Sequence, residues 1–291
     1  MSPEASLPKR LPPAGRVAVI ATASALQAGQ IDAGLTALAR LGHRALEGPT
    51  LELRERSFAG SIDQRARDLG WALSDPEVDA VWVARGGYGT AQLLASLEGI
   101  ELDERPVIGY SDLTALHVWL ARRGRASIHG PVLKELPARH EALVPLLAGE
   151  RPPALAGAQL CGSIRPLEGP LLGGNLTVLS SLCGTPFSLD ARGAIVLLED
   201  TGEAPYRLER ALTQLIDSGA LDGACAFGLG DFTRCGEPGA ALAALRARLE
   251  PLGRPVIAGL PFGHGARNLA WIHGAAYRLE AATLSRETGL R

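Results

Sequence analysis

The sequence has little of what marks several large classes of protein. Aromatic residues make up only 4% of its 291 residues, and no run of eighteen apolar residues is present that would cross a bilayer as a helix. Lysine and arginine (29) nearly balance aspartate and glutamate (31), so the formal charge of -2 gives no reason to expect a nucleic acid or a membrane as partner. The 46% hydrophobic content instead favours a globular protein of one large or two ordinary domains.

Cysteines are few and widely spaced. Cys161, Cys183, Cys225 and Cys235 lack the close spacing of metal ligands, and four cysteines in a chain of this length do not form a disulfide scaffold. We therefore expect buried free thiols and no metal site. Residues 1–5 contain no apolar core of a secretory signal, so we also expect a cytoplasmic protein.

The first half of the chain alternates apolar strands with helical segments. Ser61 and Gln64 form a capping box, which marks the start of a helix. Strands separated by helices predict a parallel, doubly wound sheet, and hence an α/β fold. We expect the following strands and helices: strands at residues 17–21, 80–84, 106–108 and 126–129, and helices at residues 30–41, 62–73 and 113–123.

A segment rich in proline and glycine divides the chain. Prolines and glycines interrupt every regular period between residues 134 and 170, which predicts a linker. The pattern beyond it predicts a second, smaller α/β domain, with residues 1–150 forming the first domain and residues 151–291 the second. We expect the following elements there: a short helix after Gly173-Gly174-Asn175-Leu176-Thr177, strands at residues 194–198, 224–229 and 255–258, and helices at residues 206–216 and 240–249.

Gly109-Tyr110-Ser111-Asp112 lies where the strand at residues 106–108 turns into the helix at residues 113–123. A serine at such a corner projects its hydroxyl outward, and the helix behind it directs unpaired backbone amides toward the same point. Ser111 is therefore a candidate nucleophile, although the generic Gly-x-Ser-x-Gly elbow ends here in Leu113. The plainer interpretation is that the Ser-Asp pair only caps the helix.

A glycine-rich segment, Arg85-Gly86-Gly87-Tyr88-Gly89, follows the strand at residues 80–84. Reactive groups in parallel sheets gather at the carboxyl ends of the strands, so this segment and Ser111 are expected to face one crevice. Gly87 is then a candidate for a second oxyanion donor beside the amide of Asp112. A simple tight turn is an alternative, whereas a phosphate-binding loop would need a lysine or a glycine spacing that is missing.

Two strand ends in the second half carry the groups that a serine nucleophile needs. Glu199 follows the strand at residues 194–198, and His264 follows the strand at residues 255–258. A serine hydroxyl requires a neutral imidazole to accept its proton and a carboxylate to hold the imidazole in the right tautomer. Ser111, Glu199 and His264 are therefore the predicted catalytic set.

Other residues compete for these roles. Glu203 is an alternative to Glu199, and His129, in His129-Gly130-Pro131, is an alternative to His264. His117 is also present, but it is most simply a residue on one face of the helix after Ser111. A carboxylate after a strand often caps the next helix, and a histidine between glycines is often an ordinary loop residue.

Seven short blocks in the order of the chain resemble the motif series of the LD-carboxypeptidases, a family of serine peptidases that includes the microcin C immunity hydrolases. The resemblance extends from about residue 15 to about residue 280. The blocks are Arg85-Gly86-Gly87-Tyr88-Gly89, Gly109-Tyr110-Ser111-Asp112 with Thr114-Ala115-Leu116-His117, His129-Gly130-Pro131, Gly173-Gly174-Asn175-Leu176, Gly184-Thr185-Pro186, Glu199-Asp200-Thr201-Gly202-Glu203 and Pro261-Phe262-Gly263-His264.

The resemblance implies a Ser-His-Glu triad of Ser111, His264 and Glu199, with the amides of Asp112 and Gly87 as oxyanion donors. It also implies a homodimer whose N-terminal α/β domain and C-terminal swivelling domain assemble the triad between them. The enzyme would act without metal or cofactor. Its implied activity is removal of the terminal D-alanine from the L,D-linked tetrapeptide of recycled muropeptides.

Substrate contacts are less well defined by the sequence. An exopeptidase must recognise a free carboxylate, and Arg85 at the crevice is our candidate for this role, with an interdomain ion pair as the alternative. Asn175 is the candidate for binding the peptide backbone. A microcin-immunity-type hydrolase of aminoacyl-sulfamoyl adenylates is the alternative function, although the sparse aromatics argue against an adenine-stacking site. A non-catalytic protein that binds a small anion at Gly86, Gly87 and the helix amides is the alternative from another class.

Overall fold

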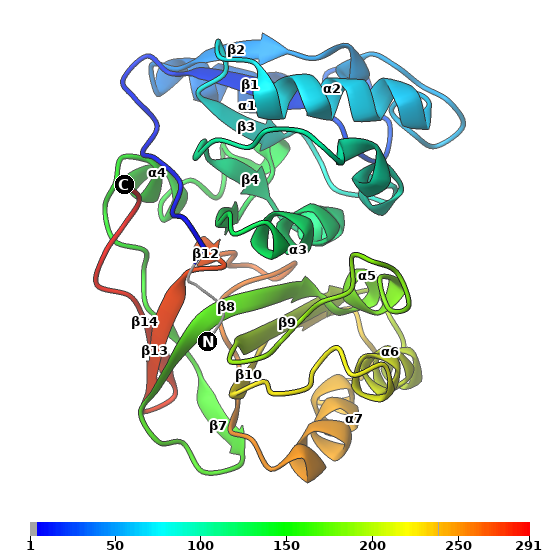
Figure 1. Ribbon diagram of the computed structural model, residues 1–291, viewed down its shortest axis with the longest axis vertical. Coiled ribbons are helices and arrows are strands. Elements are labelled where there is room, and N and C mark those ends of the chain that lie inside the picture. Colours follow the sequence, from blue (N-terminus) through cyan, green and yellow to red (C-terminus); the bar gives the residue numbers. More distant parts are fainter. Residues whose placement is uncertain (1–4, 238) are drawn as a thin grey trace.

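The structure is a computed structural model that describes residues 5–237 and 239–291. Two β-sheets lie one above the other, with helices packed against them, as Figure 1 shows. The predicted α/β fold is therefore confirmed. Residues 1–4, to which most of the expectation about a secretory signal refers, lie outside the described residues.

The first sheet has six strands in the order β12-β5-β4-β3-β1-β2. The chain places β2 on one side of β1 and β3, β4 and β5 on the other, which is the doubly wound arrangement that we predicted. Its parallel strands are β1 (Arg16–Ile20), β2 (Arg44–Glu47), β3 (Ala80–Val83), β4 (Val107–Gly109) and β5 (Ser127–His129).

Helices cover both faces of this sheet. Along β1 the side chains alternate between two cores: Val17 and Val19 lie in the core that includes α1, and Ala18 and Ile20 lie in the core that includes α2 and α3. The predicted capping box opens α2, where the Ser61 side chain accepts a hydrogen bond from the Gln64 amide. The helices are α1 (Asp32–Arg40), α2 (Ile62–Ser74) and α3 (Thr114–Arg122), with 3-10 turns η1 (Pro49–Leu51), η2 (Thr90–Leu97) and η3 (Ser111–Leu113).

The second sheet has eight strands in the order β6-β14-β13-β8-β9-β10-β11-β7. Its centre is parallel and consists of β8 (Leu167–Asn175), β9 (Ile195–Thr201), β10 (Ala226–Thr233) and β11 (Val256–Ala258). On one face, Val196 and Leu198 share a core with α5 (Leu176–Ser181), α6 (Pro205–Asp217) and α7 (Ala240–Leu249). The short 3-10 turn η5 (Glu250–Leu252) follows α7.

The prediction of a linker over residues 134–170 is wrong in part. The segment contains short elements: η4 (Leu133–Glu135) extends into it, and α4 (Leu143–Leu147), β6 (Leu155–Ala156), β7 (Ala158–Cys161) and the start of β8 follow. Proline is compatible with these positions. Pro145 lies in the first turn of α4, where an amide has no intrahelical partner, and Pro170 precedes Leu171, the first residue of β8 that pairs with β9.

The end of the chain returns to both sheets. Strand β12 (Trp271–His273) pairs antiparallel with β5, so the second half of the sequence supplies an edge strand to the first sheet. Strands β13 (Ala276–Glu280) and β14 (Thr283–Ser285) then join the second sheet next to β8. The sequence analysis predicted none of these three short strands. The boundary between residues 150 and 151 stays a prediction.

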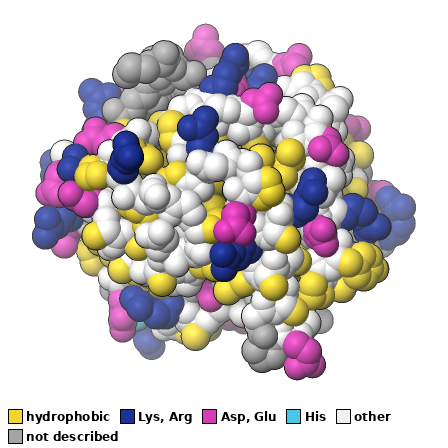
Figure 2. Space-filling model, turned by 90° about the horizontal axis from the view of Figure 1, so that it is seen from below, with side chains coloured by type: hydrophobic (Ala, Val, Ile, Leu, Met, Phe, Trp, Pro, Cys, Tyr) yellow, Lys and Arg dark blue, Asp and Glu magenta, His cyan; other side chains and the backbone are white. Residues whose placement is uncertain are grey.

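The surface carries charges of both signs. Figure 2 shows basic and acidic side chains interspersed on the face seen from below, without a large patch of one sign. Among the described residues, no helix is both long and apolar enough to cross a membrane.

Candidate active site

Ser111 lies at the corner between β4 and the helix α3, as predicted. Its backbone φ is +65°, a left-handed conformation that is uncommon for a residue other than glycine. Backbone strain of this kind persists only where the surrounding structure enforces it, and it is frequent at active sites. The conformation turns the chain abruptly from the strand into the 3-10 turn η3, and the side chain of Ser111 stays partly exposed.

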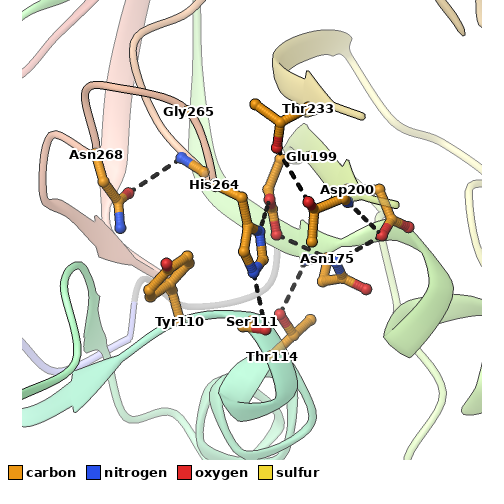
Figure 3. Close-up of polar contacts among 12 residues, drawn as sticks. Tyr110, Ser111, Thr114, Asn175, Glu199, Asp200, Thr233, His264, Gly265 and Asn268 are labelled. Carbon is orange, nitrogen blue, oxygen red and sulfur yellow. Dashed lines mark hydrogen bonds and ion pairs between the residues drawn. The ribbon is translucent and has the colours of Figure 1, made fainter. Parts of the chain in front are cut away.

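The structure brings the two predicted partners of Ser111 together from the second half of the chain. His264, in the loop after β11, has its Nε2 atom 3.2 Å from Ser111 Oγ and its Nδ1 atom 2.7 Å from Glu199 Oε2. Figure 3 shows the imidazole between the serine and the carboxylate. Because an ionised carboxylate only accepts hydrogen bonds, Nδ1 carries the proton and Nε2 is free to accept from the serine hydroxyl. This is the tautomer that a general base needs.

The ionisation of His264 is set by opposing effects. Burial acts to lower its pKa, but the hydrogen bond to Glu199 and the charges of Glu199 and Glu135 outweigh burial and raise the pKa above its ordinary value of 6.5. The carboxylate of Glu199 is completely buried, and burial raises its pKa above the ordinary value, although hydrogen bonds from His264 and Asn175 act to lower it. The pair therefore favours an imidazole that readily accepts a proton.

Asn175, at the end of β8, supports the carboxylate of Glu199. Its Nδ2 atom lies 3.3 Å from Glu199 Oε1 and 3.0 Å from Asp200 Oδ1, while its Oδ1 atom caps α5 by accepting from the amide of Val178. Asp200 is buried and also accepts hydrogen bonds from Thr177. Asn175 is only 5% exposed, so these contacts favour a role in positioning Glu199 over the predicted contact with a substrate backbone.

Asn175 also links the two halves of the site. Its backbone amide donates a hydrogen bond to Thr114 Oγ1 over 2.9 Å. Thr114 is the first residue of α3, the helix that follows Ser111. The support of Glu199 is therefore attached to the helix that carries the nucleophile, as the adjoining side chains in Figure 3 show.

The competing residues have other partners. Glu203 forms an ion pair with Arg207 at 3.5 Å. His117 is buried, and its Nε2 donates to the carbonyl of Gly109 while its Nδ1 accepts from Ser127. Burial lowers the pKa of His117 to about 4.

His129 does not contact Ser111 by a hydrogen bond either. Its ring is fully buried and stacks on Trp271 at a centroid distance of 4.7 Å. Neither of its ring nitrogens has a hydrogen-bond partner among the described residues, and burial lowers its pKa well below 6.5. Of the histidines considered in the sequence analysis, it is His264 that forms the hydrogen bond to Ser111.

The glycine-rich loop after β3 contacts the serine. A methyl group added to Gly86 would lie 3.1 Å from Ser111 Cβ and Oγ, which places the loop against the serine side chain. Gly87 is exposed and has a φ of +139°, and a methyl group there would collide with Ser24. The carboxylate of Asp112 is buried and points back to this loop, where it accepts from the amide of Thr90.

Arg85 immediately precedes the loop. Its guanidinium donates to the carbonyls of Ala25 and Gly86 and lies 3.4 Å from Gln30 Oε1. Within the described residues, no carboxylate forms an ion pair with Arg85, so the alternative of an interdomain ion pair has no support. Arg85 is half-buried, and its role in binding substrate stays a prediction.

A further group of contacts holds the His264 loop, and sequence reasoning missed it. The Tyr110 ring lies 4.8 Å from the His264 ring, and its hydroxyl donates to Glu135 over 2.9 Å. Arg139, one turn after Glu135, donates to the carbonyl of Gly265 over 2.6 Å. The spacing of Glu135 and Arg139 is a helical signal, but both residues lie within residues 134–170, the segment that we interpreted as a linker. Among the described residues, no cluster of three or more His, Cys, Asp or Glu side chains is arranged to hold a metal ion.

The fold and the site thus define a hydrolase of the serine type, in which strand ends of two α/β sheets bring a serine, a histidine and a buried glutamate together. Comparison with models of known protein families identifies the family of serine hydrolases to which the chain belongs. Residues 17–130 match the model of the LD-carboxypeptidase N-terminal domain, and residues 168–279 match the model of the LD-carboxypeptidase C-terminal domain. The chain belongs to the LD-carboxypeptidase family and is a serine carboxypeptidase.

Individual relatives agree with this assignment. The chain is 40% identical to the murein tetrapeptide carboxypeptidase of Pseudomonas aeruginosa over 93% of its own length and 94% of the relative's. It is 32% identical to the probable murein peptide carboxypeptidase of Bacillus subtilis, covering 94% and 92% of the two chains.

Solved structures have the same architecture. The muramoyltetrapeptide carboxypeptidase from Oxalobacter formigenes has a TM-score of 0.79 and 27% identity over 94% of this chain and 98% of that one. An MccF-like protein from Bacillus anthracis has a TM-score of 0.81 over 98% of each chain, but at 20% identity it shows the fold alone.

Proposed function

We propose that this enzyme removes the terminal D-alanine from the L,D-linked tetrapeptide of muropeptides, with Ser111 as nucleophile, His264 as general base and Glu199 as the orienting carboxylate. The observation that carries the proposal is the continuous chain of contacts from Ser111 Oγ through His264 to Glu199, at 3.2 and 2.7 Å. The names of the relatives in Pseudomonas and Oxalobacter, a murein tetrapeptide and a muramoyltetrapeptide carboxypeptidase, support this class of substrate.

In the first step, Ser111 Oγ attacks the carbonyl carbon of the scissile bond while His264 Nε2 takes the hydroxyl proton. The carbonyl oxygen becomes an oxyanion, which the amides of Gly87 and Asp112 would stabilise. His264, now protonated and held by Glu199, gives its proton to the leaving nitrogen. The C–N bond breaks, D-alanine leaves, and the remaining peptide is an ester of Ser111.

The second step reverses these roles with water. Neutral His264 takes a proton from a water molecule, whose oxygen attacks the ester carbonyl. The tetrahedral intermediate again directs its oxyanion to the same amides. It collapses when His264 returns the proton to Ser111 Oγ, so the tripeptide carboxylate leaves and the serine is regenerated.

We assign the binding of the substrate carboxylate and the support of Glu199 to two side chains near the triad. Arg85 would pair with the free carboxylate of the terminal D-alanine, since its guanidinium lies beside the glycine loop and has no acidic partner among the described residues. Asn175 would hold the buried oxygen of Glu199, because its amide donates to both neighbouring carboxylates.

We further propose that the enzyme is a cytoplasmic homodimer that acts in the recycling of cell-wall peptides. The balanced charge and the motif series resembling this family support the proposal. Light scattering coupled to size-exclusion chromatography tests the dimer directly: a mass of one 30.4 kDa chain would contradict it.

Product analysis by mass spectrometry tests the proposed activity. Wild-type enzyme should release D-alanine from a muramyl tetrapeptide, and the Ser111→Ala variant should release none above background while keeping its circular dichroism spectrum. A pentapeptide and an aminoacyl-sulfamoyl adenylate, offered in parallel, separate the alternatives. Turnover of the adenylate alone would contradict the proposed substrate, and undiminished turnover by the serine variant would contradict the mechanism.

A further inference from the structure

One peptide group in the glycine-rich loop is held from both sides by buried charged side chains. The carbonyl of Gly89 accepts a hydrogen bond from Arg65 Nη1 over 3.1 Å. The amide of Thr90, which belongs to the same peptide group, donates to Asp112 Oδ2 over 2.8 Å. Arg65 is 1% exposed and Asp112 is 2% exposed, so water does not compete for these bonds.

Arg65 is fixed by further contacts around its guanidinium. It donates to the carbonyls of Thr22 and Gly60 and to Gln92 Oε1, and it lies 4.8 Å from the centre of the Phe58 ring. A guanidinium with partners on every side has one orientation. Arg65 therefore acts as a rigid support for the carbonyl of Gly89 rather than as a mobile surface charge.

Glycine is required where the loop meets this support. Gly89 has a φ of +136°, and a methyl group on its Cα would lie 2.6 Å from Arg65 Nη1. The backbone thus approaches the guanidinium more closely than any other residue type would permit. This packing fixes the loop two residues after Gly87.

Asp112 connects this loop to the nucleophile. Its backbone follows Ser111 directly, while its side chain reaches the amide of Thr90. Burial raises the pKa of Asp112 above its ordinary value, although the hydrogen bonds from Thr90 and Gly89 and the charge of Arg65 act in the opposite direction. One residue therefore supplies a proposed oxyanion donor from its backbone and holds the loop of the other donor with its side chain.

We propose that Arg65 and Asp112 are positioning residues of the oxyanion hole. Their side chains clamp the Gly89–Thr90 peptide group, and this orients the amide of Gly87 toward the position of the oxyanion before the substrate binds. This inference rests on the proposed function, because it assigns Gly87 and Asp112 as the oxyanion donors. Donors that are already oriented stabilise the transition state without a reorganisation cost. Loss of the clamp weakens an interaction made only in the transition state, so kcat falls and KM changes little.

Arg65→Lys and Asp112→Asn test the clamp. Lysine keeps the positive charge but loses the fork of donors, and asparagine keeps the shape but loses the negative charge. We expect each substitution to lower kcat by about 10- to 100-fold with KM within about threefold. Affinity for a peptide boronic acid, whose adduct with serine carries the tetrahedral oxyanion, should fall in parallel with kcat, whereas affinity for the tripeptide product should not.

Arg105→Lys is the matched control. Arg105 is also a largely buried arginine that donates to two backbone carbonyls, those of Ala72 and Asp75, but these lie at the C-terminal end of α2, whereas Arg65 lies in the first turn of that helix. This variant should lower the melting temperature to a similar degree and leave kcat and boronate affinity within about twofold, since it changes stability only.

Two results would contradict the clamp. In the first, Arg65→Lys or Asp112→Asn lowers the melting temperature while kcat and boronate affinity stay at the wild-type level. In the second, affinity for the product falls as much as affinity for the boronate. If Asp112→Asn does not fold, Arg65→Lys decides alone, since it retains the charge. Failure of the proposed function is distinct: wild-type enzyme would then release no D-alanine. Failure of the clamp leaves wild-type turnover dependent on Ser111 and insensitive to Arg65.

Discussion

The two halves of the active site are held by different means. Ser111 lies at the end of β4 in one sheet, and its own left-handed backbone φ fixes its position. Glu199 and His264 come from segments 65 residues apart, and side-chain hydrogen bonds hold them. Backbone geometry is local and resists single side-chain changes, whereas each side-chain hydrogen bond is lost with one substitution. Substitutions of these two side chains and of the residues that contact or support them should therefore produce a graded series of losses.

The largest loss is expected for His264→Ala. Ser111 then has no base, and kcat should fall by about 10⁴-fold or more. Because the His264 side chain is 19% exposed, the variant should fold, which a thermal melt checks. Activity within tenfold of wild type, measured as D-alanine release, would mean that Ser111 does not need this imidazole as its base.

Glu199→Gln should have the next largest effect. A glutamine amide can donate to Nδ1 and so stabilise the tautomer with its proton on Nε2, which cannot accept from Ser111. We expect kcat to fall by roughly 10³- to 10⁴-fold. Glu203→Gln is the control, since Glu203 pairs with Arg207, and it should retain nearly full activity. Equal losses in the two variants would reject Glu199 as the orienting group.

Thr114→Val tests the link between the halves. Valine has nearly the same shape but leaves the buried amide of Asn175 without its acceptor, at a cost of about 1–3 kcal/mol in unfolding free energy. A small displacement of Glu199 relative to Ser111 should also lower kcat by about tenfold. Thr185→Val, which removes a hydroxyl bonded only within the second half, serves as control. If both variants lose stability but neither loses activity, the link does not align the triad.

The smallest effect is expected in the pH profile of Glu135→Gln. In the proposed mechanism activity requires neutral His264, so activity is present above the pKa of that group and falls as pH drops through it. The charge of Glu135 contributes to raising this pKa above 6.5. Its removal should extend activity to lower pH, by less than about one unit. A profile of kcat/KM against pH that does not move, or moves to higher pH, would exclude this influence.

The same contrast explains which residues of the site could be predicted from the sequence. Ser111 could be located from local sequence, because a strand, a corner and a helix follow one another around it. The pairing of Glu199 with His264 rested on chemistry and on the family resemblance, since no local pattern connects the two residues.

Other parts of the site depend on contacts that no local pattern reports. Thr114 and Arg65 are ordinary helical residues in the sequence, and their partners lie on distant segments. Strand β12 is only three residues long, and its place beside β5 follows from tertiary packing. The linker prediction failed for a related reason: the proline-rich segment forms elements too short to show a periodic pattern.

The most direct test measures the reactivity of Ser111 itself. A fluorophosphonate should phosphonylate the protein once, at Ser111, and peptide mapping by mass spectrometry identifies the residue. The labelling rate should rise with pH through an apparent pKa above 6.5 and should fall at least about 100-fold in His264→Ala. Labelling at another residue, or an equal rate with and without the imidazole, would contradict the account that the second half of the molecule activates the serine of the first.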